Sequence, residues 1–201
     1  MHFELIAMKI LLFSDIHNSK KAFEKLKNYL SNNKFDLVLF AGDFTNNWQE
    51  DVLYVKEILN YFLKQKIRFL AVPGNNDRQN ILDLMYKYNV NLHMEMQKVG
   101  DYEFYGIGGW ANPEEYRLSK NKSYPINPKT IFVSHIPPNF KLIPKFKILP
   151  QVHIFSHKHF QSTPKVIKNC LFIQIPSILN FRIVILELPK KKVKFIKLTN
   201  S

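Results

Sequence analysis

Residues 10–17 of the chain read ILLFSDIH, an apolar run that ends in an aspartate and a histidine. Short runs rich in Val, Ile, Leu and Phe are typical of buried strands. Four further apolar runs end in the same way, and the residues that follow them are Gly42-Asp43, Gly74-Asn75-Asn76-Asp77, Ser134-His135 and Ser156-His157-Lys158-His159. In open α/β sheets, ligands bind just beyond the carboxyl ends of the strands. The sequence therefore predicts one sheet edge with enough Asp, Asn and His to hold metal.

Three helices are expected between the first strands. The first is capped by Asn18 or Ser19 and ends near Asn32, the second covers about residues 49–65, and the third covers about residues 80–88. The apolar residues expected on the inner side of the second helix are Leu53, Ile58, Leu59 and Phe62. This alternation of strand and helix predicts a largely parallel sheet at the start of the chain.

The second half of the chain is rich in strands and poor in helices. The expected strands cover residues 102–107, 130–133, 152–155, 171–175, 183–188 and 193–198. Residues 188–192 resemble a hairpin turn between the last two. His153 lies inside a strand, four residues ahead of His157, and is expected to be structural or to lie on the opposite face. The pattern as a whole favours an α/β fold.

Length and composition favour one domain. A chain of 201 residues with 46% hydrophobic residues can bury one core, so we expect a single domain over residues 1–201. Residues 1–7 are either a short extension or the result of a start placed too early, because Met8 is a natural beginning for the first strand. No apolar stretch approaches the roughly 20 residues that span a bilayer, and no signal peptide is recognisable. The single cysteine, Cys170, excludes an internal disulfide and fits a reducing cytoplasm.

The net charge of +13 is unevenly distributed. No Asp or Glu occurs in residues 116–186, which hold 11 of the 29 Lys and Arg residues. Such a field attracts phosphate-bearing substrates and leaves nucleic acid open as a partner. A solvated, lysine-rich surface is the alternative. The sequence leaves the oligomeric state open.

In chain order, the clusters D-x-H, G-D, G-N-x-D, S-H and S-H-x-H resemble the motifs of the calcineurin-like metallophosphoesterases. The resemblance covers about residues 8–188 and is greatest to the small single-domain prokaryotic phosphoesterases. The segment from Gly106 to Trp110, ahead of Pro113, resembles the glycine turn of those proteins. The fold that the resemblance implies is two packed mixed β-sheets flanked by helices, a four-layer α/β sandwich.

The resemblance also implies a dinuclear metal site. The residues implied for the first ion are Asp15, His17 and His159, those for the second are Asn75, His135 and His157, and Asp43 is the implied bridge. These ligand types favour manganese among divalent ions, with iron, nickel and zinc as alternatives. The implied activity is hydrolysis of a phosphorylated small molecule or a phosphodiester by a metal-bridging hydroxide, with diesters favoured over monoesters.

The chain departs from the family pattern at three positions. Ser134 and Ser156 stand where the family usually has glycine, and Asn76 stands where many members have histidine. An amide donates hydrogen bonds but cannot act as a general acid. Asn76, Asp77 and Arg78 are therefore the candidate catalytic residues, Asp77 by fixing the turn and Arg78 by supplying positive charge. The alternatives are a catalytically weakened, metal-containing scaffold protein and a nuclease that uses the basic half of the chain.

Overall fold

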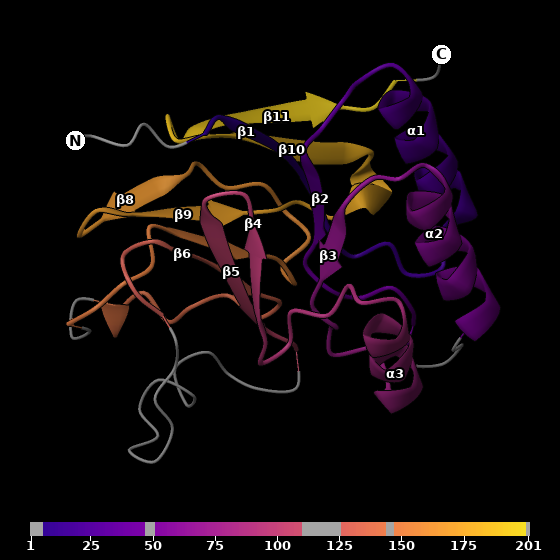
Figure 1. The fold of residues 1–201 in the computed structure, drawn as a ribbon, viewed down its shortest axis with the longest axis horizontal. Coiled ribbons are helices and arrows are strands. Elements are labelled where there is room, and N and C mark those ends of the chain that lie inside the picture. Colours follow the sequence, from indigo (N-terminus) through magenta and orange to yellow (C-terminus); the bar gives the residue numbers. More distant parts are fainter. Residues whose placement is uncertain (1–5, 47–50, 110–125, 144–146, 200–201) are drawn as a thin grey trace.

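The computed structural model describes residues 6–46, 51–109, 126–143 and 147–199. Two mixed β-sheets are stacked face to face (Figure 1). In spatial order, the five-stranded sheet contains β11 (Lys192–Lys197), β10 (Arg182–Leu188), β1 (Met8–Phe13), β2 (Leu37–Phe40) and β3 (Phe69–Ala71). The six-stranded sheet contains β4 (Met96–Val99), β5 (Tyr102–Ile107), β6 (Thr130–Ser134), β7 (Val152–Phe155), β9 (Cys170–Gln174) and β8 (Lys165–Ile167). The helices are α1 (Lys20–Ser31), α2 (Val52–Lys64), α3 (Gln79–Lys87) and the short 3₁₀ helix η2 (Ile178–Asn180).

Parallel pairing determines where the loops meet. β1, β2 and β3 run parallel to one another, and so do β5, β6, β7 and β9. The carboxyl ends of parallel neighbours lie at the same edge of a sheet. The largely parallel start is thus confirmed, and β10 and β11 form the expected antiparallel hairpin.

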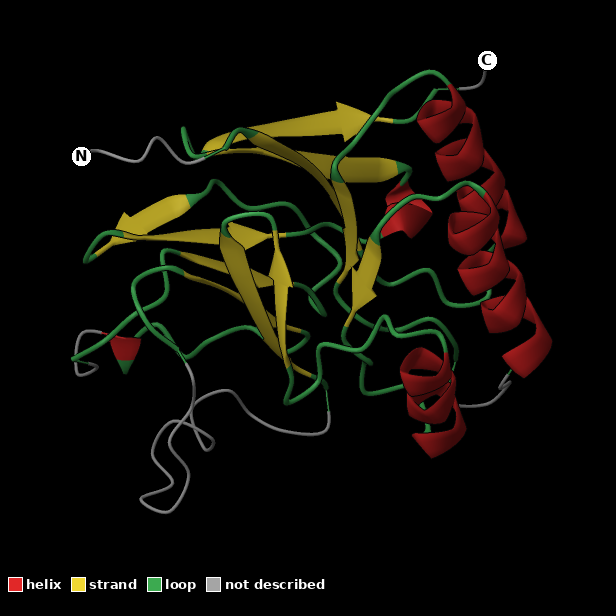
Figure 2. Ribbon diagram, viewed as in Figure 1, coloured by secondary structure: helices red, strands yellow, loops and turns green. Residues whose placement is uncertain are grey.

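Strands β1, β2 and β3 of the five-stranded sheet are buried on both faces, whereas the edge strand β11 contains no buried residue. Leu11 and Phe13 of β1 pack in the layer that contains the helices, whereas Ile10 and Leu12 pack against the six-stranded sheet. This alternation follows from the two-residue period of a strand. α1, α2 and α3 gather on one side of the molecule (Figure 2), so the α/β class with two packed mixed sheets is confirmed. Among the described residues, loops rather than α-helices cover the outer face of the six-stranded sheet.

The cap predicted for α1 is confirmed, whereas the predicted inner side of α2 includes one wrong residue. Ser19 caps α1, since its side chain accepts a hydrogen bond from the N–H of Ala22 at 3.2 Å. Asp51 caps α2 in the same way, through Tyr54 N at 2.9 Å. The inward placement of Leu53 was wrong, because this side chain is 77% exposed. The start of the predicted second helix, residues 49 and 50, lies outside the described residues.

The buried stripe of α2 has helical spacing and excludes Leu53. Its members are Tyr54, Val55, Ile58, Leu59 and Phe62. Leu53 precedes Ile58 by five residues, about 140° away around the helix, so it faces solvent. No helix among the described residues is both long and apolar enough to cross a membrane.

Two strands were not predicted, β4 and β8. Both lie at the edges of the six-stranded sheet, and neither contains a fully buried residue. Their sequences, MQKV and KVI, are short and partly charged. Edge strands of this kind carry little of the alternating hydrophobic pattern that reveals a strand.

The register of α2 can be tested by two alanine substitutions. Ile58 is fully buried, so Ile58→Ala should lower the free energy of unfolding by about 2–5 kcal/mol. Leu53→Ala should change it by no more than about 0.5 kcal/mol, because that side chain is exposed. Urea denaturation of both variants measures the difference, and equal losses would contradict this helix register.

Candidate metal centre

Backbone hydrogen bonds hold the loops that follow β1, β2, β6 and β7 against one another. Asp15 N donates to Gly42 O at 2.8 Å, and Ile16 N donates to Asp43 O at 2.9 Å. Ser156 N donates to His135 O at 3.1 Å. These bonds join the loops in two pairs, and the hydroxyl of Ser156 joins the two pairs by donating to Ala41 O at 2.6 Å.

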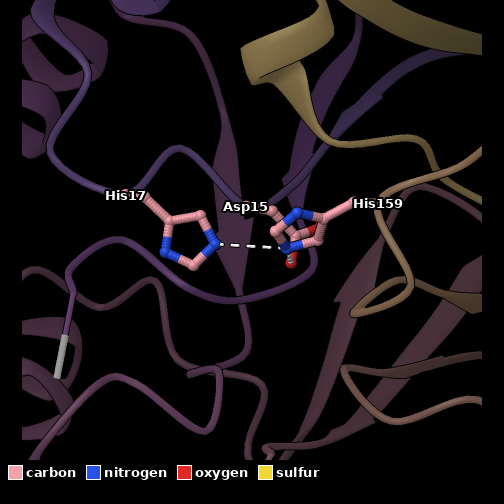
Figure 3. Close-up of side chains that lie close together, drawn as sticks. All are labelled: Asp15, His17 and His159. Carbon is pink, nitrogen blue, oxygen red and sulfur yellow. Dashed lines mark hydrogen bonds and ion pairs between the residues drawn. The ribbon is translucent and has the colours of Figure 1, made fainter.

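The first candidate cluster contains Asp15, His17 and His159, whose side chains point toward one another (Figure 3). The Nε2 atoms of the two histidines are 3.3 Å apart, and His159 Nε2 is 3.4 Å from Asp15 Oδ1. Ligand atoms about 2.0–2.2 Å from one ion are about 3.0–3.5 Å from each other. The three groups therefore have the mutual spacing of ligands on one ion.

The second candidate cluster contains Asp43, His135 and His157. His135 Nε2 lies 3.2 Å from His157 Nδ1 and 2.9 Å from Asn75 Oδ1. Asn75, His157 and Asp43 thus converge on His135 Nε2, so Asn75 lies with the second candidate cluster.

Asp43 faces both clusters. Its Oδ2 atom is 3.4 Å from His135 Nε2 and 3.7 Å from His17 Nε2. One carboxylate therefore lies between an imidazole of each cluster, the position that a bridging ligand requires.

Second partners fix the tautomers of two histidines. His17 Nδ1 donates to Thr45 O at 3.1 Å, and His135 Nδ1 donates to Ala41 O at 2.8 Å. A carbonyl oxygen only accepts, so in the neutral imidazole the proton stays on Nδ1 and Nε2 keeps its lone pair. Both rings are thus oriented to coordinate a cation through Nε2.

Asp15 gives an independent test of whether the residues fit a cation. Its carboxylate is fully buried, and neither oxygen accepts a hydrogen bond from another described residue. A buried carboxylate without donors is strongly unfavourable unless a positive charge lies nearby. A divalent ion between Asp15 and the two histidines would remove that cost, so the donor set fits a metal.

The electrostatics of the second cluster favour an ionised bridge. Burial is the largest single effect and opposes charge on Asp43, but the contacts with His135 and the hydrogen bonds from Asn76 together outweigh it and lower the pKa of this carboxyl. Burial also opposes charge on His135, whose pKa is nevertheless raised by Asp43. The Asp15 carboxylate, 3.4 Å from His159 Nε2, raises the pKa of His159, whereas burial lowers the pKa of His157.

Most of the candidate ligands have left-handed backbone conformations. Five of the seven candidate ligands have positive φ angles, and they are Asp15, His17, Asp43, His157 and His159. For residues other than glycine this conformation costs about 1–2 kcal/mol each. Strain of this kind persists where the surrounding structure enforces it, commonly at functional sites.

The glycines of the G-D and G-N motifs permit close contact between loops. Gly42 has a φ of 101°, and a Cβ there would collide with His135 Nδ1. A Cβ on Gly74 would overlap the carboxylate of Asp43. These two positions therefore exclude larger residues because the candidate ligands occupy the space.

Asp77 joins the loop after β2 to the loop after β3. It is almost completely buried. Its Oδ2 accepts hydrogen bonds from the N–H groups of Asp43, Phe44 and Gly74 at 3.1, 3.2 and 2.8 Å. Its Oδ1 accepts from Thr45 N at 3.0 Å and from the hydroxyl of Thr45 at 3.1 Å. Asp77 therefore fixes the backbone that presents Asp43.

Asn76 is turned toward Asp43. Its N–H donates to Asp43 Oδ1 at 2.9 Å, and its side-chain Nδ2 donates to Asp43 Oδ2 at 2.7 Å. Arg78 is exposed at the N-cap of α3, where no side-chain hydrogen bond caps the helix. The three candidate catalytic residues thus differ in position, and only Arg78 among them is exposed.

The two serines in place of glycine have defined partners. Ser134 Oγ donates to Ile136 O at 2.7 Å and lies 2.8 Å from His153 Nε2. His153 packs among aromatic rings, including Phe132 and Phe172, away from the metal clusters, as expected for a structural histidine. Ser156 Oγ donates to Ala41 O at 2.6 Å.

Several groups that shape the centre had no signal in the sequence. They include the carbonyls of Ala41 and Thr45 and the Oγ of Ser177, which donates to Asp15 O at 2.9 Å. Every residue carries a carbonyl, so only the folded structure reveals which one meets a histidine. In the glycine turn, Gly109 N donates to Pro73 O at 2.9 Å. Trp110 and Pro113 lie outside the described residues.

The role of Asp77 predicts a loss of stability on a nearly isosteric change. Asp77→Asn replaces one acceptor oxygen by a donor group that faces N–H donors. Each buried group that loses its partner costs about 1–3 kcal/mol, so the free energy of unfolding should fall by at least that amount. The control Asp83→Asn changes an exposed carboxylate of α3 and should have little effect. Equal stabilities of the two variants in guanidinium denaturation would contradict the role of Asp77.

Sequence comparison identifies a family and one relative. The profile of the calcineurin-like phosphoesterase family matches residues 8–171. The uncharacterized protein MJ1162 of Methanocaldococcus jannaschii is 28% identical over 142 residues. That match covers 65% of this chain and 62% of the relative, so the chain spans less than two thirds of the length of the curated relative it matches.

Structural comparison identifies the same fold at low sequence identity. TT1561 of Thermus thermophilus has a TM-score of 0.70 at 17% identity, over 96% of this chain and 100% of that one. An archaeal phosphodiesterase has a TM-score of 0.62 at 18% identity, over 94% and 99% of the two chains. Yfce, a phosphoesterase from E. coli, has a TM-score of 0.57 at 13% identity, over 96% and 100%. With the family profile matching most of its length, the chain belongs to the calcineurin-like phosphoesterases.

Proposed function

We propose that the protein is a phosphoesterase that binds two divalent ions and hydrolyses phosphodiesters in preference to phosphomonoesters. The observation that carries the proposal is the position of Asp43, whose Oδ2 lies between His17 and His135 at 3.7 and 3.4 Å. The family depends on two metal ions, and the chain has two candidate ligand clusters.

Each side chain has a defined task in this proposal. The first ion would be held by Asp15, His17 and His159, the second by Asn75, His135 and His157, and both by Asp43. Bound divalent ions supply Lewis-acid charge and make a water molecule more acidic. The carboxylates of Asp15 and Asp43 offset that positive charge, and the Nδ1 hydrogen bonds of His17 and His135 keep their rings aimed at the ions.

Manganese is the ion that we propose, with iron, nickel and zinc as alternatives. Imidazole, carboxylate and amide ligands suit these metals. The thiol of Cys170, which soft ions prefer, is buried in the cluster with Phe155 and Phe172 rather than among the candidate ligands. A single buried cysteine also fits the proposed cytoplasmic location, and the core shared by the two sheets fits one domain.

Asn76 supports the preference for diesters with good leaving groups. Its amide donates to Asp43 and has no acidic proton to give to a departing oxygen. We propose that Arg78 supplies positive charge to the phosphoryl group, because it is exposed and follows the Asn75–Asp77 turn directly. A structural relative is an archaeal phosphodiesterase, which agrees with diester hydrolysis.

Asn76, which stands where many family members have histidine, also favours one alternative, a weakened enzyme that acts as a metal-containing scaffold. That protein would bind ions without turnover.

The positions of the lysines give the nuclease alternative less support than Asn76 gives the scaffold alternative. Lys129 and Lys168 lie at the amino ends of β6 and β9, whereas the metal clusters lie beyond the carboxyl ends of the parallel strands.

Elemental analysis of purified variants tests the metal assignment. Asp43→Ala should remove both ions because it deletes the shared ligand, and His159→Ala should weaken one ion only. Asp83→Asn, which changes an exposed carboxylate outside the clusters, should retain the wild-type content. Two ions per chain in Asp43→Ala would disprove the bridging role.

The leaving-group dependence tests the role of Asn76. General acid catalysis is worth about 10²–10⁴-fold, so a nitrophenyl diester should be cleaved faster than an alkyl diester by a factor of that order. Asn76→His should raise kcat/KM for the alkyl diester more than for the nitrophenyl diester. The gain should stay below the full factor, since the variant also loses the 2.7 Å contact with Asp43. Equal wild-type rates for the two diesters would show that another group already protonates the leaving oxygen.

A further inference from the structure

A concavity lies at the edge of the sheets opposite the metal centre. It has a volume of about 290 Å³ and is lined by Pro128, residues 147–151, the β8–β9 turn at Lys168 and Asn169, and Lys191 of the β10–β11 turn. These segments adjoin the amino ends of β6, β7 and β9. The metal clusters lie beyond the carboxyl ends of β6 and β7.

The length of β6 separates the pocket from the metal centre. Pro128 lines the pocket, and His135 belongs to the second candidate cluster. Seven residues of extended chain at about 3.3 Å each span roughly 20 Å. A ligand of the size of this pocket therefore cannot contact the metal centre at the same time.

Three lysines from separate segments of the chain line this pocket. They are Lys147 before β7, Lys168 in the β8–β9 turn and Lys191 in the β10–β11 turn. None of the described residues that line the pocket is acidic. Lys191 Nζ donates to Asn169 O at 3.4 Å, which brings the turns of the two sheets together. The pocket thus combines three ammonium groups with no carboxylate among its described lining residues.

The walls of the pocket are partly apolar. Leu149 is buried in the floor, and Ile148 is 59% exposed beside the lysines. A volume of about 290 Å³ is close to the lower end of small-molecule sites, which begin at about 300 Å³. The pocket therefore suits a compact anion with an apolar portion better than an extended strand of nucleic acid.

We propose that this pocket binds a small organic anion that carries two or more phosphate groups. Lysine ammonium groups bind phosphate as point charges, and three of them can neutralise a diphosphate. The apolar side chains of Ile148 and Leu149 would contact the organic part. The site is separate from the metal centre, so its occupation does not depend on the proposed hydrolytic activity.

Calorimetric binding of two probes to the full chain tests the proposal. The probes are inorganic tripolyphosphate and ADP, and EDTA in the buffer prevents binding through ions of the metal centre. The pocket variant is Lys168→Gln/Lys191→Gln. The control variant, Lys64→Gln/Lys87→Gln, removes the same charge from exposed positions on α2 and α3. Near-UV circular dichroism checks that each protein is folded under these conditions.

The expected result is saturable binding of both probes, weakened at least about tenfold in the pocket variant and unchanged in the control. ADP binding should also weaken in Ile148→Ser, because that variant removes apolar contact and keeps the charge. Absence of binding in dilute salt, or equal weakening in the pocket and control variants, would overturn the proposal. A 20-nucleotide single-stranded DNA that loses more affinity than ADP in the pocket variant would overturn the assignment to a small ligand.

Discussion

The hydrogen bonds of Asp77 are the constraint on which the metal centre depends. One buried carboxylate accepts from the backbone of Asp43, Phe44, Thr45 and Gly74, so it holds together two loops that come from different strands. These donors satisfy a buried charge that would otherwise be strongly unfavourable. The loops in turn present Asp43 to both candidate clusters. The geometry of the shared ligand is therefore determined by a residue that is itself buried beneath the centre.

The stacked sheets make the strained loops possible. Left-handed backbone at Asp15, His17 and Asp43 is unfavourable in an isolated peptide, and the buried carboxylate of Asp15 adds to the cost. The strands that precede these loops are almost entirely buried, and the core between the sheets takes residues from both of them. Burial of this apolar surface offsets the strain and fixes the strand ends. A cation between the carboxylates would relieve the electrostatic part of the cost.

The sequence predicted those features that depend on residue type and short-range pattern. Buried strands are visible as apolar runs, and Asp15 or His159 is visible as a ligand type at a strand end. Features that depend on tertiary contacts were not predictable. The carbonyl of Thr45 has no signature until it meets His17. The exposure of Leu53, in contrast, follows from its helical spacing to Ile58, and the predicted inner side of α2 included it wrongly. The edge strands β4 and β8 were missed because neither has a continuous apolar face.

The lysine-lined pocket illustrates that a sequence shows how many charged residues a stretch contains but not where they lie on the folded surface. The acid-free stretch suggested a field around the substrate, yet Lys147 and Lys168 lie near the amino ends of the parallel strands. In the sequence, Lys158 lies between the candidate ligands His157 and His159, and Arg78 follows the Asn75–Asp77 turn, so these two cations adjoin the metal centre. Attraction of the substrate to the metal centre and binding of an anion in the lysine-lined pocket are therefore separate properties of the same basic protein.

The central claim, that Asp43 bridges two ions, is tested most directly by anomalous X-ray diffraction at the manganese edge from crystals grown with Mn²⁺. The account predicts two peaks per chain, one among Asp15, His17 and His159 and one among Asn75, His135 and His157, with Asp43 within coordinating distance of both. About 3.5–4 Å should separate the peaks. A single peak, or two peaks of which one lies away from Asp43, would contradict the account.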